Sequence, residues 1–258
     1  MNVQSVYNFI DELAPFSYAM SFDNSGLLLG DPQTPVTKIL VTLDCTLPAV
    51  EKAIEEGADL IIAHHPVIFD PIKNVLAGSA VHKALTAGIS VICAHTNLDI
   101  ARGGVNDCLA KALGLGCLEG LSPIPCRKDG QEVTEYLGRI SFIKEALSPD
   151  DFAAYVKDKL GASIRYTAGS RPVSRVAVCG GSGADCLDDA IALGADALVT
   201  SEVKHHIFLQ AQQAGITLID AGHFHTEDVV IEPLAERLRW QFPDVPVVTY
   251  HLDAVKAL

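Results

Sequence analysis

The strongest constraint on the fold is a phrase that this chain contains twice. Gly57-Ala-Asp-Leu-Ile-Ile-Ala-His-His in the first half matches Gly194-Ala-Asp-Ala-Leu-Val-Thr-Ser-Glu in the second, and Gly88-Ile-Ser-Val-Ile-Cys-Ala-His-Thr matches Gly215-Ile-Thr-Leu-Ile-Asp-Ala-Gly-His. Counted from residues 38 and 175, which lie in the first strand of each half, Gly-Ala-Asp starts 19 residues on in both. The alternative explanation for the match is coincidence between alternating strand–helix units, because Gly ends many helices. Three units that repeat in parallel order favour a duplication.

Short runs rich in Val and Ile alternate with helical patterns along the whole chain, which is typical of a parallel sheet wound with helices. The expected strands are residues 38–44, 58–63, 89–96, 174–179, 195–200, 216–222 and 245–251. The expected helices cover an amphipathic N-terminal segment and residues 47–57, 78–88, 103–114, 148–161, 202–215 and 223–240. We therefore predict an α/β fold of two related, three-layer lobes, 1–115 and 171–258, that face each other across a metal cleft. Residues 116–170 would form a connector of mixed strand and helix.

Composition narrows the function classes. The 258 residues suffice for two lobes with a sizeable core. A formal charge of −13, without a Lys/Arg cluster, disfavours nucleic-acid binding. No apolar run is long enough to span a membrane, the N-terminus lacks the pattern of a signal peptide, and the seven cysteines have no zinc-ribbon or disulfide spacing. These features predict a cytoplasmic protein.

Chemistry-bearing residues follow the expected strands. His64 and His65 come directly after strand 58–63, at the carboxyl edge where ligands gather in open α/β sheets. Such a pair is otherwise a hydrogen-bonded or surface pair. His95 and Asp99 follow the strand that begins at residue 89. Asp99 could instead cap a turn, and His95 could be a core histidine, a support for a ligand, or a ligand.

The second lobe places further metal-ligand types at the equivalent edge. His223 follows the strand 216–222, and Glu227 comes four residues later, so on a helix both would lie on one face. An exposed helical pair is the alternative. Three separate segments that converge in this way favour a metal centre held by His64, His65, Asp99, His223 and Glu227.

The donor set indicates the ions and the chemistry. Imidazoles and carboxylates without thiolate favour zinc, iron, manganese, cobalt or nickel over calcium. The number of donors exceeds the need of one ion, so we expect two divalent ions per chain, bridged by Glu227. Two adjacent ions can polarise an electrophile and generate a nucleophile from water at neutral pH. Hydrolysis is therefore the expected reaction type.

Other polar residues at the same edge are candidates for supporting roles. Glu202 could act as a general base or a cap, His95 is the second candidate for a catalytic role, and Asn24, Asp44 and His205 could bind substrate. Residues 179–183 (CGGSG) offer backbone N–H groups that could cradle an anion. They lack the spacing of a dinucleotide or phosphate-binding loop.

At these residues the sequence resembles the GTP cyclohydrolase 1 type 2 homologues, or NIF-three-like proteins. The resemblance is carried, in order, by residues 21–31 (SFDNSGLLLGD), 41–46 (VTLDCT), 58–69 (ADLIIAHHPVIF), 94–107 (AHTNLDIARGGVND), 176–183 (VAVCGGSG), 197–206 (ALVTSEVKHH) and 220–227 (DAGHFHTE). Two departures are visible: Ser201 replaces a usual glycine and Phe22 a frequent tryptophan. Residues 115–170 are too few for the domain that some members insert, so the chain resembles the compact form.

The resemblance implies two α/β lobes around a dinuclear site, with the five ligands named above and His95 nearby. It also implies a homo-oligomer, in the form of a ring-shaped hexamer, and hydrolytic opening of the guanine ring of GTP. A small-molecule substrate is the expected partner; nucleic acid and membrane are not. The alternative function is a non-catalytic protein that binds, delivers or senses metal for partners.

Overall fold

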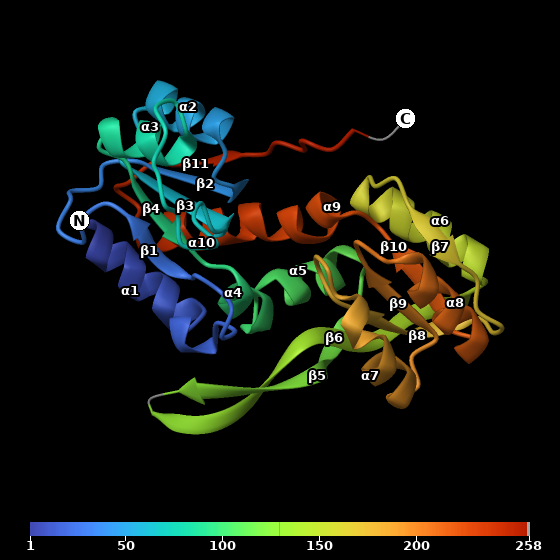
Figure 1. The fold of residues 1–258 in the computed structure, drawn as a ribbon. Helices are drawn as coiled ribbons and strands as arrows, with labels where there is room; N and C mark the ends of the chain where they lie inside the picture. The colour runs from blue at the N-terminus through green and yellow to red at the C-terminus, as the bar shows by residue number, and fades with distance from the viewer. Residues whose placement is uncertain (129, 257–258) are drawn as a thin grey trace. The chain divides into compact units, whose positions relative to one another are not determined.

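The computed structural model describes residues 1–128 and 130–256 of the chain (Figure 1). The chain divides into two compact units. The first contains Met1–Ala101 and Ile231–Ala254, and the second contains Arg102–Val230. Each unit has its own mixed sheet covered by helices, so the predicted α/β class is confirmed.

The first unit has a five-stranded sheet in the order β1-β4-β3-β2-β11. Its strands are β1 (Gly26–Leu29), β2 (Ile39–Asp44), β3 (Leu60–His65), β4 (Ser90–Cys93) and β11 (Val247–Tyr250). Strand β1 runs antiparallel to β4, whereas β4 with β3, β3 with β2, and β2 with β11 form parallel pairs. Because β2, β3 and β4 are parallel, their carboxyl ends meet at one edge of the sheet.

Helices cover both faces of this sheet. They are α1 (Val3–Leu13), the short η1 (Phe16–Tyr18), α2 (Leu47–Glu56), α3 (Ala80–Thr86), α4 (Thr96–Ile100) and α10 (Ile231–Gln241). Helices α2 and α3 lie on one face and α1 and α10 on the other (Figure 1). The α2–α3 face is sealed by alternate strand residues such as Leu40, Ile61 and Val91, which are fully buried. Apolar residues with a period of 3.6 in the helices and of two in the strands thus pack into one three-layer unit.

The second unit has a six-stranded sheet in the order β5-β6-β8-β9-β10-β7. Its strands are β5 (Gly116–Lys128), β6 (Gln131–Leu147), β7 (Arg165–Thr167), β8 (Val173–Val178), β9 (Ala197–Thr200) and β10 (Thr217–Asp220). Strands β8, β9 and β10 are parallel. Strands β5 and β6 form a long twisted antiparallel ribbon (Figure 1).

Two apolar cores cover the two faces of the second sheet. The helices are α5 (Val105–Ala112), α6 (Pro149–Leu160), η2 (Ala184–Cys186), α7 (Leu187–Ala192), α8 (His205–Ala214), α9 (His223–Glu227) and η3 (Asp228–Val230). Val176 and Val199 pack with α5 and α6 on one face, whereas Leu198 and Leu218 pack with α7 and α8 on the other. Strand alternation therefore determines which core each residue joins.

The two units share a structural repeat that extends to single hydrogen bonds. In both, three parallel strands are followed at one edge by an antiparallel strand, β1 or β7. The Asp of each Gly-Ala-Asp sequence accepts hydrogen bonds from two backbone N–H groups near the start of the preceding strand. Asp59 Oδ2 lies 2.6 Å from Thr37 N and 3.1 Å from Lys38 N; Asp196 Oδ2 lies 3.1 Å and 2.8 Å from the N atoms of Ser174 and Arg175. Equal roles at matched positions support the duplication inferred from the sequence.

The boundaries of the units differ from the predicted lobes. Strand β11, placed by the sequence in the second lobe, pairs with β2 in the sheet of the first unit. The segment 116–170 is no separate connector, because β6 pairs with β8 and β7 with β10. The predicted helix 223–240 is three elements, α9, η3 and α10. Among the described residues, no helix combines the length and apolarity needed to cross a bilayer.

Candidate metal centre

Three imidazoles gather at the carboxyl edge of the first sheet. His64 and His65 end β3, and His95 immediately precedes α4, in the link that follows β4. The ring centroids of the three histidines are 4.9 to 5.5 Å apart. One ring nitrogen of each lies within 4.8 Å of the others, so the three residues could hold a metal ion.

An oxygen atom anchors Nδ1 of each ring. His64 Nδ1 lies 2.8 Å from the carbonyl oxygen of Ala94, His65 Nδ1 2.8 Å from Asp44 Oδ1, and His95 Nδ1 2.8 Å from Asp23 Oδ1. An acceptor at Nδ1 fixes the tautomer and turns Nε2 into the ligating atom, as in the carboxylate–histidine–metal triads of metalloproteins. The residues therefore fit a bound transition-metal ion, both in donor type and in how the donors are held.

Asp99 adds a carboxylate to this cluster. It lies within α4 and is 8% exposed, and its Oδ1 is 3.6 Å from His64 Nε2. The position of Asp99 within α4 brings its carboxylate close to the ligating atom of a buried imidazole.

Asp23 supports the cluster, and the sequence analysis did not select it. Its carboxylate accepts hydrogen bonds from His95 Nδ1, from the backbone N of Thr96 at 3.0 Å and from Ser25 Oγ at 2.8 Å. Burial raises the pKa of Asp23, but the hydrogen bonds from His95, Thr96 and Ser25 outweigh it and hold the pKa well below its usual range. A turn-rich DNS segment gives no signal that its Asp will contact a histidine 72 residues away.

The second unit carries one imidazole and one carboxylate at the start of α9. His223 Nε2 lies 2.9 Å from Glu227 Oε2, and Glu227 is 4% exposed. The predicted i, i+4 pair on one helical face is present. His223 Nδ1 lies 2.9 Å from Glu202 Oε1, so this ring is anchored like those of the first unit. The pair thus has the donors and the support of metal ligands.

Glu202 occupies an unusual backbone conformation. Its φ of 54° lies in the left-handed region, which side chains other than Gly seldom adopt. This conformation accompanies the contact between its carboxylate and His223. Glu202 matches His65 in the repeat, so the position of a candidate ligand in the first unit is that of a supporting residue in the second.

The glycine-rich turn after β8 was a possible anion cradle, but the structure gives its N–H groups other partners. Its N–H groups are used within the protein: Gly180 N donates to Asn106 Oδ1 at 2.9 Å and Gly181 N to Thr226 Oγ1 at 3.1 Å. A Cβ on Gly181, whose φ is 62°, would lie 2.0 Å from Glu227 Oε1. The glycines therefore let the backbone approach the buried Glu227.

Ser201 takes part in the same arrangement. Its hydroxyl donates to the carbonyl oxygen of Gly181 at 2.6 Å. The departure from glycine at this position thus gains a hydrogen bond that fastens the turn beside Glu227.

The three residues predicted to bind substrate have different positions. Asp44 holds His65, and Asn24 Nδ2 donates to the carbonyl oxygen of Ile68 at 2.7 Å. His205 is exposed at the start of α8 and lines a surface hollow of about 360 Å³ with Arg165 and Phe208. The lining of that hollow does not include His223, Glu202 or Glu227.

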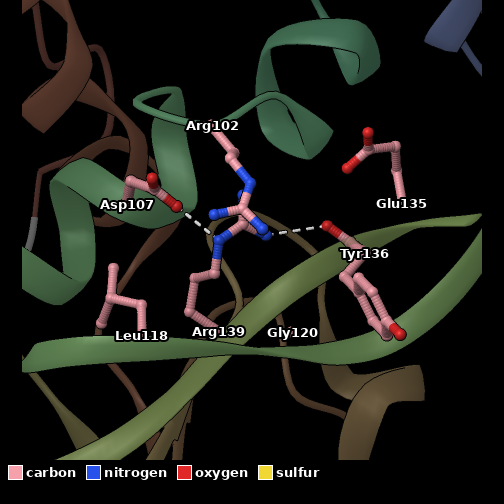
Figure 2. A pocket seen from close by; sticks show the side chains of 7 residues that line it. All are labelled: Arg102, Asp107, Leu118, Gly120, Glu135, Tyr136 and Arg139. Atoms are coloured by element: carbon pink, nitrogen blue, oxygen red, sulfur yellow. Dashed lines mark hydrogen bonds and ion pairs between the residues drawn. The ribbon is translucent and has the colours of Figure 1, made fainter. Parts of the chain in front are cut away.

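A smaller cavity of about 50 Å³ lies between α5 and the β5–β6 ribbon (Figure 2). Arg139 donates through Nε to Asp107 and through Nη1 to the carbonyl oxygen of Tyr136 at 2.8 Å. Figure 2 shows Arg102 reaching toward Arg139, with Glu135 on the opposite side from Asp107. Two guanidinium groups and two carboxylates line this cavity, so its charges balance and it has no preference for an anion.

Parallel-strand ends that carry anchored imidazoles and buried carboxylates define an α/β protein with the donor set of a transition-metal site. A family model described as Duf34/NIF3 (NGG1p interacting factor 3) matches residues 1–255, and the chain belongs to this family.

Curated relatives and solved structures agree with this assignment. A Clostridium perfringens protein named GTP cyclohydrolase 1 type 2 homolog is 31% identical over 247 residues, covering 93% of this chain and 92% of the relative. A Streptomyces coelicolor protein of the same name is 34% identical over 234 residues, covering 87% and 81%. The crystal structure of a Staphylococcus aureus hypothetical protein matches with a TM-score of 0.93 and 32% identity, covering 100% of this chain and 99% of that one.

Proposed function

We propose that this protein binds two divalent metal ions and hydrolyses a nucleotide or related heterocycle, with opening of the guanine ring of GTP as the first reaction to test. The observation that carries the proposal is the anchoring of His64, His65, His95 and His223 through Nδ1, which leaves Nε2 as the ligating atom in each. The name shared by the relatives suggests the reaction.

Counting donors supports two ions. A catalytic ion of this type takes about three protein ligands and keeps a further position open. The first unit offers three imidazoles and Asp99, and the second offers His223 and Glu227. Six donors are the number that two such ions would take. Glu227 is the candidate for a bridging ligand, and His95 would complete the donor set.

When bound, a metal pair would supply Lewis-acid polarisation of the substrate and a nucleophile from water at neutral pH. The chain's own residues orient the ligands. Asp44, Asp23 and Glu202 each hold one imidazole through Nδ1. Because Glu202 holds His223, we now propose it as a positioning residue in place of a general base.

The chemistry of the donors restricts the ion. Imidazole and carboxylate favour zinc, iron, manganese, cobalt or nickel. Cys93 is close by, with its Sγ donating to the carbonyl oxygen of His64 at 3.0 Å. Burial raises the pKa of the Cys93 thiol far above its usual value, and the thiol hydrogen is donated to that carbonyl oxygen.

Elemental analysis of the purified protein, followed by incubation with GTP in the presence of the identified metal, tests the proposal. We expect about two ions per chain and a ring-opened product, both lost in Glu227→Ala. His206→Ala, which removes an exposed histidine of α8, serves as the matched control. Intact GTP with the metal fully bound would contradict the substrate. Tight metal binding without turnover across a nucleotide and phosphoester panel would favour the alternative, a metal-delivery or regulatory protein.

We also propose a homo-oligomer, with a hexamer as the expected form, on the basis of the family resemblance. Light scattering coupled to size-exclusion chromatography measures the mass directly. A monomeric mass of 27.5 kDa would overturn this part.

A further inference from the structure

Two exposed phenylalanines stand beside the histidine cluster of the first unit. Phe22 is 61% exposed and Phe69 46% exposed, and their ring centroids are 6.4 Å apart at an interplanar angle of 46°. The ring of Phe69 is also 6.3 Å from the ring of His95, edge to face at 79°. Two solvent-exposed aromatic rings therefore lie next to a candidate metal ligand.

Hydrogen bonds from neighbouring residues fix both rings relative to His95. Asp23, next to Phe22, accepts from His95 Nδ1 at 2.8 Å. Asn24 Nδ2 donates to the carbonyl oxygen of Ile68, next to Phe69, at 2.7 Å. One short turn thus ties the histidine and both aromatic segments together. Both rings are largely exposed, so they contribute little to the core.

We propose that Phe22 and Phe69 form a stacking platform that recognises the planar heteroaromatic ring of the substrate at the metal centre. The inference rests on the proposed function, because it assigns the substrate class of that same site. Phenyl rings offer a π-face and no hydrogen-bonding atoms, so they select planarity and leave polar recognition to other groups. A ring stacked on Phe69 would lie next to His95, a candidate metal ligand.

A second copy of the chain is the other occupant to consider for this surface. A stable protein interface covers about 800 Å² on each partner, which is more than Phe22 and Phe69 provide, even with the exposed Ile72, Val75 and Leu76 of the loop that carries Phe69. A self-association surface would also have no need for the hydrogen bonds that hold the segments of Phe22 and Phe69 near His95. These arguments favour the ring of a small molecule.

Binding of guanosine monophosphate and of ribose 5-phosphate, which lacks the base, tests the platform. Both are titrated by calorimetry into the metal-loaded protein. Stacking on an aromatic side chain contributes about 1–3 kcal/mol per base, so we expect Phe22→Ala/Phe69→Ala to weaken guanosine monophosphate binding about 5- to 150-fold. Ribose 5-phosphate binding, metal content and thermal unfolding should stay unchanged. Leu76→Ala is the matched control, because Leu76 is 71% exposed on the same loop.

A fluorescence experiment gives a second readout that needs no turnover. The chain has one tryptophan, Trp240, which is 82% exposed. In a Trp240→Phe background, Phe22→Trp should be quenched by guanosine monophosphate and not by ribose 5-phosphate.

The outcomes separate the two proposals. Ring binding that depends on Phe22 and Phe69 without any GTP turnover would support the platform and count against the hydrolase. Guanosine monophosphate binding that is equally tight in the double variant, or absent from the wild type, would overturn the platform even if metal binds. A change in oligomer mass without a change in nucleotide affinity would also overturn it, by assigning the surface to self-association.

Discussion

The two units of this protein have the same framework and different chemistry at their strand ends. In both, three parallel strands carry an antiparallel neighbour, and Asp59 and Asp196 fasten the start of the first strand in the same way. The end of β3 carries His64 and His65, whereas the matched positions after β9 are Ser201 and Glu202, which support a turn and a histidine. A duplicated fold can thus retain its structural residues while its candidate ligands diverge.

The candidate ligands of the two units differ in burial, and this difference predicts how much each contributes to metal affinity. The His64 side chain is 0% exposed and that of His223 is 34% exposed. We expect His64→Ala to reduce metal affinity by more than about 100-fold, beyond the effect of removing an orienting residue. We expect a smaller loss for His223→Ala, since water can replace an exposed ligand.

Competition with a chromophoric chelator measures both affinities, and His206→Ala provides the baseline. Equal losses in the two variants would break the comparison, because they would show that burial does not distinguish the ligands.

The residues that hold Nδ1 provide a sharper test. The side chain of Asp23 is 0% exposed and that of Glu202 is 56% exposed. Removing a carboxylate that orients a ligand typically costs about 10- to 100-fold in metal affinity. We expect Asp23→Asn near the upper end of this range and Glu202→Gln near the lower end, measured by the same chelator competition.

Thermal unfolding of both variants separates a loss of orientation from a loss of folding. A Glu202→Gln variant with unchanged affinity and unchanged stability would remove the support role in the second unit.

For the framework that the two units share, we predict equal effects of matched substitutions on stability. Asp59→Ala and Asp196→Ala each leave two backbone N–H groups without their acceptor, which costs about 1–3 kcal/mol. We expect the two variants to lower the free energy of unfolding by similar amounts in denaturant titrations. Asp158→Ala, at an exposed position of α6, should change it by less than about 0.5 kcal/mol. A large loss in only one unit would argue that the matched aspartates are a coincidence.

The smallest expected difference between the units is in the reactivity of their cysteine thiols. Burial raises the pKa of Cys45 in the first unit to about 12, and Asp44 adds to the increase, whereas Cys117 of the second unit is exposed. A raised pKa means less thiolate at a given pH, and the thiolate is the reactive form. We therefore expect iodoacetamide at pH 8 to label Cys117 quickly and Cys45 only after unfolding, as measured by peptide mass spectrometry. Rapid native labelling of Cys45 would contradict its burial.

Local periodicity was sufficient to predict much of the framework. The strands 38–44, 58–63, 195–200 and 216–222 correspond to β2, β3, β9 and β10, because alternating or continuous Val/Ile runs between Gly-capped helices leave few other options. The placement of β11 in the first sheet was not predictable in this way. A strand's partner depends on which sheet edge the rest of the chain leaves available, and the hydrophobic pattern of β11 is the same beside either sheet.

The candidate ligands show the same division. Spacing along the chain was enough to place His64 and His65 at the end of a strand, Asp99 after a strand, and His223 and Glu227 on one helical face, because each depends on a local pattern. Only the tertiary structure decided that Asp23 holds His95, that Asp44 holds His65 and that Glu202 holds His223. These contacts join residues 21 to 72 positions apart, and folding brings together side chains whose proximity no local pattern records.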